Sequence, residues 1–147
     1  MTTKVRTLIS VVVVGVIVIL IGLLANQAKA QTLTILASFN GANGGSVYPS
    51  GGLILSGSTL YGTTYWGGTS GSGTVFSLPL AGGTPTTLAS FNGTNGYCLP
   101  GSLILSGSTL YGVTSNGGIS GQSSDGYTGY GTVFSLPISG GTPTTLV

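Results

Sequence analysis

Short runs of apolar and β-forming residues, separated by glycine and other turn residues, cover most of this chain beyond residue 30, which is the pattern of β-strands. In the stretch 74–78, the side chains of Thr74, Phe76 and Leu78 fall on one face of a strand and the two between them on the other. Beyond residue 30 no stretch has a helical period, and the many glycines and the 6 prolines there would interrupt a helix of useful length. The pattern predicts an essentially all-β chain.

The predicted strands come in two copies. The string LILSGSTLYG at residues 53–62 recurs unchanged at residues 103–112, and GTVFSLP and GGTPTTL are each present twice. In the first copy the predicted strands cover residues 53–55, 59–61, 74–78 and 86–91. Gly57 suits a tight hairpin turn, and Pro79 ends the third strand because proline cannot donate to a ladder. Four antiparallel strands in about 50 residues are the size of one β-propeller blade.

This spacing divides the chain into a first repeat at about 40–91 and a second at about 92–147. A stray strand at 31–39 precedes them and matches the fourth strand of an otherwise missing copy. A propeller closes with about four to eight blades, so two repeats cannot form a ring. Three arrangements remain open: several chains associate, the chain is a piece of a longer array, or the strands close on themselves as a sandwich. Self-association or further repeats are therefore the predicted partners, because a ladder without charged residues is an association site.

The second copy carries an insertion. Tyr61 and Tyr111 are 50 residues apart, whereas Phe76 and Phe134 are 58 apart, so eight extra residues lie between Gly112 and Gly131. The inserted stretch is polar and rich in glycine, which predicts an elongated loop. Loops vary where the scaffold does not, so a function specific to this copy would be found here.

The N-terminal segment has the layout of a secretory signal peptide. Lys4 and Arg6 precede an apolar run from Leu8 to Leu24, and Ala28-Lys29-Ala30 supplies the small residues of a cleavage site. We predict a hydrophobic signal helix within residues 1–30, with cleavage after Ala30, and a secreted or cell-surface protein. A retained membrane anchor is the alternative, with membrane contact only through residues 8–24.

Charge is confined to very few positions. All three basic residues lie in the N-terminal segment, and Asp125 is the single acidic residue of the chain, which has no histidine. Nucleic-acid binding is not expected, because neutralising phosphates takes clustered lysine or arginine. General acid and base catalysis needs at least two suitable groups, so no enzyme, no catalytic residue and no cofactor are predicted. No metal site is predicted either, since a solvated loop aspartate explains Asp125 better than a calcium ligand.

Loop aromatics are the best candidates for a binding site. Tyr65 and Trp66 stand beside two glycines in the first copy, and Tyr127 with Tyr130 occupy the inserted loop of the second. Such rings bind neutral ligands such as a polysaccharide by apolar contact and hydrogen bonds. The alternative is that these rings cap a sheet edge or pack between repeats. Cys98, the single cysteine, is predicted to be a buried thiol, with a disulfide to another chain as the alternative.

The repeated unit, with its strings LILSGSTLYGTT, GTVFSL and LASF, resembles the Gloeobacter and Verrucomicrobia tandem repeat, called the GloVer repeat. The resemblance covers about Leu36 to Leu146. It implies a secreted or surface protein of many such repeats, often followed by a C-terminal sorting anchor, and it implies no catalytic residue. The expected function is that of a secreted, non-enzymatic structural or interaction module, with a carbohydrate-binding module as the alternative.

Overall fold

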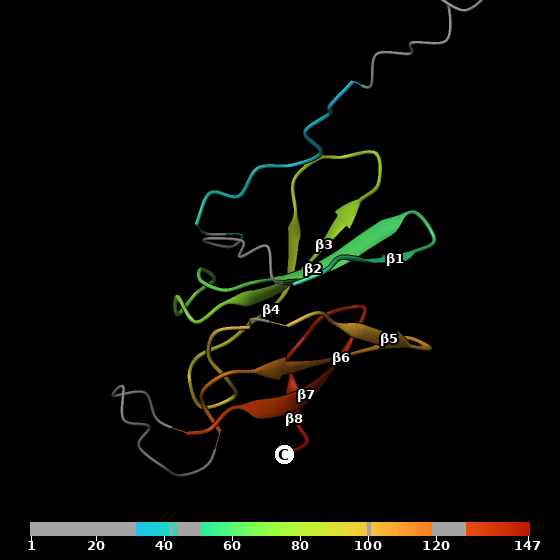
Figure 1. Ribbon diagram of the computed structural model, residues 1–147. Coiled ribbons are helices and arrows are strands. Elements are labelled where there is room, and N and C mark those ends of the chain that lie inside the picture. The colour runs from blue at the N-terminus through green and yellow to red at the C-terminus, as the bar shows by residue number, and fades with distance from the viewer. Residues whose placement is uncertain (1–31, 42, 44–50, 100, 119–128) are drawn as a thin grey trace, which may run out of the picture. The chain divides into compact units, whose positions relative to one another are not determined.

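The computed structural model describes residues 32–41, 43, 51–99, 101–118 and 129–147, and Ile35–Val147 form one compact unit. The regular secondary structure of these residues consists of two four-stranded antiparallel sheets and contains no helix (Figure 1). The all-β prediction is therefore confirmed. The predicted signal helix lies outside the described residues. In the part of the chain that is described, no helix has the length and apolar character needed to cross a membrane.

Each repeat forms one sheet, and its strands pair in chain order. The first sheet consists of β1 (Ile54–Ser56), β2 (Thr59–Thr64), β3 (Thr74–Pro79) and β4 (Thr86–Ser90). The second consists of β5 (Ile104–Ser106), β6 (Thr109–Thr114), β7 (Thr132–Pro137) and β8 (Thr144–Thr145). These are the four strands predicted for each copy, and the first hairpin of each turns through a glycine at φ 58°, Gly57 or Gly107. A positive φ at the first turn position matches the right-handed twist of the strands.

Glycine also permits a close approach inside each sheet. Gly62 of β2 is paired with Phe76 of β3, and Gly112 of β6 with Phe134 of β7. A Cβ atom at Gly62 would lie 2.7 Å from Phe76 Cζ, and one at Gly112 would lie 2.5 Å from Phe134 Cζ. Each buried phenylalanine ring therefore occupies the space that any other residue at the glycine would fill.

A buried threonine pair closes the loop between the two central strands of each sheet. Thr64 and Thr74 share a hydrogen bond of 2.9 Å between their Oγ1 atoms, and Thr114 and Thr132 share one of 3.0 Å. The first threonine of each pair also donates to the carbonyl of the residue two positions later, at 2.7 and 2.9 Å. All four hydroxyls are buried with a partner, which satisfies groups that would otherwise destabilise the core.

The two sheets share one hydrophobic core. Phe91, which follows β4, packs edge to face against Phe134 of β7, with ring centroids 5.0 Å apart. The buried cluster takes members from both repeats: Tyr61, Val75, Ala89, Phe91, Leu99, Leu103, Leu110, Phe134 and Leu136. The repeats are therefore not two separately folded modules.

The segment predicted as a stray strand is not a strand over residues 32–39. It nevertheless copies the contacts that the end of the first repeat makes with the second. The Leu36 carbonyl accepts the Gly83 N–H at 2.8 Å, as the Leu88 carbonyl accepts the Gly141 N–H at 2.9 Å. Phe39 packs on Phe76 at 4.9 Å, as Phe91 does on Phe134. β4 is a strand because it pairs with β3. Among the described residues no strand pairs in this way with residues 32–39, so this segment forms no ladder.

We expect Gly112→Ala to destabilise the protein by about 1–3 kcal/mol, because the added methyl group overlaps the buried Phe134 ring. Urea unfolding of the variant, followed by far-UV circular dichroism, measures the loss. Ser108→Ala in the exposed hairpin turn is the matched control and should leave the midpoint unchanged. Equal midpoints for Gly112→Ala and the control would contradict this account of the glycine.

Candidate functional site

Two of the predicted aromatic residues lie together at the junction of the repeats. Tyr65 and Trp66 follow β2, and their rings meet edge to face at 5.0 Å. The Trp66 ring also meets Tyr97 of the second repeat at 5.4 Å, with an interplanar angle of 82°. All three side chains are half-buried. The row of rings therefore joins the repeats.

Sequence reasoning missed Tyr97. It stands in a stretch where the two copies differ, so the repeat pattern does not single it out. Its backbone is fixed by two hydrogen bonds with Asn116, in which the Tyr97 N–H donates at 2.8 Å and the Tyr97 carbonyl accepts at 3.2 Å. This pairing places the Tyr97 ring against Trp66.

Cys98 lies next to this row and is buried, as predicted. Its N–H donates to the Ser72 carbonyl at 3.1 Å, and its carbonyl accepts the Ser115 N–H at 3.0 Å. Burial raises the pKa of the thiol above its ordinary value of 9.0, while hydrogen bonds from Tyr65 and Tyr97 oppose the rise. The thiol is therefore protonated at neutral pH, which makes it a poor nucleophile and a poor metal ligand.

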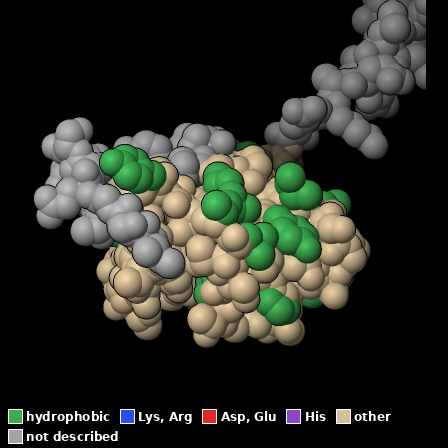
Figure 2. Space-filling view, turned by 90° about the horizontal axis from the view of Figure 1, so that it is seen from below, with side chains coloured by type: hydrophobic (Ala, Val, Ile, Leu, Met, Phe, Trp, Pro, Cys, Tyr) green, Lys and Arg blue, Asp and Glu red, His purple; other side chains and the backbone are tan. Residues whose placement is uncertain are grey.

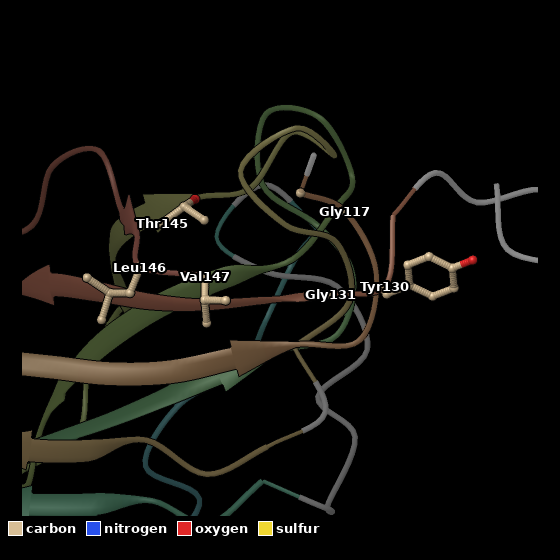
Figure 3. Close-up of a pocket in the computed structure, with 7 residues that line it drawn as sticks. Gly117, Tyr130, Gly131, Thr145, Leu146 and Val147 are labelled. Carbon is tan, nitrogen blue, oxygen red and sulfur yellow. The ribbon is translucent and has the colours of Figure 1, made fainter. Parts of the chain in front are cut away.

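Tyr130 lies in a different place. Its ring is exposed and points away from the sheet, at the mouth of a hollow of about 430 Å³ (Figure 3). The hollow is lined by Gly117, Gly118, Tyr130, Gly131, Thr145, Leu146 and Val147, and so by neither Tyr65 nor Trp66. Tyr127, the fourth predicted site residue, lies outside the described residues, as does Asp125.

The chemistry of the site is that of apolar contact and neutral hydrogen bonds. Among the residues that the structure describes, no three of the types His, Cys, Asp and Glu gather where they could hold a metal ion. None of the described residues carries a lysine, arginine, aspartate or glutamate side chain.

Two copies of one four-stranded sheet that share a core define a β-repeat protein. Within this class, the pattern of the Gloeobacter/Verrucomicrobia repeat matches residues 22–147. The chain belongs to this repeat family, as its motifs predicted. Comparison with curated proteins and with solved structures gives no match to either.

We expect the buried thiol to make stability fall at alkaline pH. Well below pH 9 the thiol is protonated in both the folded and the unfolded chain, so it contributes no pH dependence there. Above pH 9 the unfolded chain ionises first, because the folded pKa is raised, and the free energy of unfolding decreases until the folded thiol also ionises. Urea unfolding at a series of pH values measures this decrease.

Cys98→Ala is the control for this measurement, since it removes the thiol and leaves every other side chain in place. The decrease between pH 8 and pH 10 should be smaller in Cys98→Ala than in the unmodified chain. The same decrease in both proteins would contradict the raised pKa.

Proposed function

We propose that this chain is a secreted, non-enzymatic structural module of propeller-blade-like repeats that acts outside the cell. The observation that carries the proposal is the core shared by the two sheets. Some of the contacts between the repeats occur again between the N-terminal segment and the first repeat. A repeat that buries its face only against a neighbour is suited to building extended or ring-shaped arrays. The in-order pairing of four short strands in each sheet is compatible with a blade.

The reactive groups support a structural function. The single cysteine is buried and protonated at neutral pH, and the chain has no histidine. The hydroxyls of the buried threonine pairs are used within the fold. A buried thiol with a raised pKa is not available as a nucleophile.

The aromatic row supports packing over carbohydrate binding. A sugar stacks on an open ring face, whereas Trp66 is half-buried and meets Tyr65 and Tyr97 through edge-to-face contacts. Both neighbours of the tryptophan are therefore part of the junction between repeats. We assign Trp66 and Tyr65 to this junction.

The secreted location is tested by producing the full chain in a Gram-negative bacterium. We expect the protein in the periplasm or the medium, beginning at Gln31 when its N-terminus is sequenced, because Ala28 and Ala30 provide small residues at the cleavage site. Ala28→Asp removes one small residue and should leave the chain unprocessed in the membrane fraction. A full-length unmodified chain in the cytoplasm would contradict the proposal.

A further inference from the structure

Equivalent residues of the two repeats differ in exposure on one face of the sheet. Tyr61 of β2 is 8% exposed, whereas its counterpart Tyr111 of β6 is 37% exposed. Ile54 is half-buried and packs against the core, whereas Ile104 is 68% exposed. Thr63 is half-buried and its counterpart Val113 is exposed. The face is thus covered in the first repeat and open in the second.

The cover of the first repeat comes from the segment that leads into β5. The Thr63 hydroxyl donates to the Gly101 carbonyl at 3.3 Å, and the Cys98 N–H donates to the Ser72 carbonyl. Leu99 is buried, and its Cδ1 atom lies 2.7 Å from where a Cβ atom at Gly73 would be. Leu99 thus fills the space beside Gly73.

On the second repeat the equivalent face is hollow. We call it the tail face and define it by Ile104, Tyr111, Val113, Leu146 and Val147, all of them exposed. Gly131, the counterpart of Gly73, lines both the 430 Å³ hollow and one of about 260 Å³, and a third of about 140 Å³ lies beside Ile104 and Tyr111. Seen from below the second repeat, hydrophobic side chains are spread over the surface and no described charged side chain is present (Figure 2). The hollows lie at the positions that, on the first repeat, are covered by the segment leading into β5.

The first repeat has the complementary open face, on the opposite side of its sheet. Leu53 is 57% exposed, whereas its counterpart Leu103 is 5% exposed because it faces the first repeat in the shared core. Leu55 and Leu80 are also exposed, while their counterparts Leu105 and Ile138 pack against that core. We call Leu53, Leu55 and Leu80 the head face.

We propose that the tail face of one chain binds the head face of a second copy of the same chain, in the register by which the first repeat binds the second. The inference rests on the proposed function and specifies its partner. The support for this contact is the internal junction between the two repeats. Each exposed residue of the tail face and of the head face has a counterpart in the other repeat that is covered at that junction. The described residues carry no charged side chain that would oppose the contact.

Such a contact joins two different surfaces, so assembly proceeds head to tail and gives a ring where the rotation closes or a filament where it does not. A ring of about four to eight blades would take two to four copies of a two-repeat chain. In the copied register, residues 32–39 of the chain that offers its head face take the place beside β7 of the other chain that β4 has beside β3 within the first sheet. Residues 32–39 and β8 therefore compete for that edge of β7.

The test uses one blocked variant for each face, made in the chain from Gln31 because Ile35–Val147 form a compact unit. Tyr111→Glu places a charge on the tail face, and Leu53→Glu places one on the head face. By sedimentation velocity at micromolar to 100 micromolar concentrations, we expect the unmodified chain to assemble and each variant alone to be monomeric. An equimolar mixture of the variants should form complexes of two chains and no larger species.

Ser58→Glu and Ser108→Glu in the exposed hairpin turns are the controls for added charge and should assemble as the unmodified chain does. An unmodified chain that stays monomeric, or a Leu53→Glu variant that still forms dimers by itself, would overturn the proposal. Secretion with processing at Gln31 would stand in either case, so failure of this proposal is distinguishable from failure of the proposed location.

A disulfide trap tests the same register without blocking either face. At the internal junction the Gly52 N–H donates to Ser102 Oγ at 2.8 Å, and a Cβ atom at Gly52 would lie 4.0 Å from Ser102 Cβ. This distance suits a disulfide, for which about 3.5–4.5 Å is usual. Oxidation of a mixture of the Gly52→Cys chain and the Ser102→Cys chain should give a disulfide between chains. Replacing Gly52→Cys by Ser58→Cys, at the other end of β1, should abolish it, and equal yields from both pairs would overturn the register.

Discussion

The structure depends on burial of each sheet against a neighbouring copy of the same unit. A single sheet of four short strands has two faces and cannot bury both within itself. In the first repeat one face holds Phe76, which packs on Phe39, and the other holds Val75, which packs in the core shared with the second repeat. Because one face is buried against the second repeat and the Phe76 ring on the other is covered by the N-terminal segment, the stability of one repeat is linked to that of its neighbour.

The repetition of backbone contacts shows how strictly this arrangement is specified. Asn40 and Asn43 exchange hydrogen bonds between side-chain oxygens and backbone N–H groups, and Asn92 and Asn95 form the same pair. The Leu36 and Leu88 carbonyls also accept equivalent bonds, from Gly83 and Gly141. The N-terminal segment therefore contacts the first repeat in the same way as the first repeat contacts the second. A copied register of this kind is the structural reason to expect further copies at both open faces.

Local features were predictable from the sequence because they depend on short-range chemistry. The hairpin at Gly57, the strand from Thr74 to Pro79 and the burial of Cys98 follow from a positive φ, an alternating pattern and the packing of a small apolar thiol. Two features depend on long-range contacts and were not predictable. Tyr97 reaches Trp66 only through its pairing with Asn116, and residues 32–39 have the contacts of a fourth strand without the ladder of one. Of the predicted aromatic residues, Tyr65 and Trp66 form part of the junction, and Tyr130 lines the 430 Å³ hollow of the second repeat.

The central claim is tested most directly by native-state hydrogen exchange of the chain from Gln31 and of its Phe134→Leu variant. Phe134 belongs to the second sheet but packs on Phe91 at the junction of the repeats. Its replacement by a smaller side chain should therefore destabilise both repeats. The account predicts that the slowest amides of β2 and β3 lose protection by the same factor as those of β6 and β7. Loss of protection in the second sheet alone, with β2 and β3 unchanged, would contradict it.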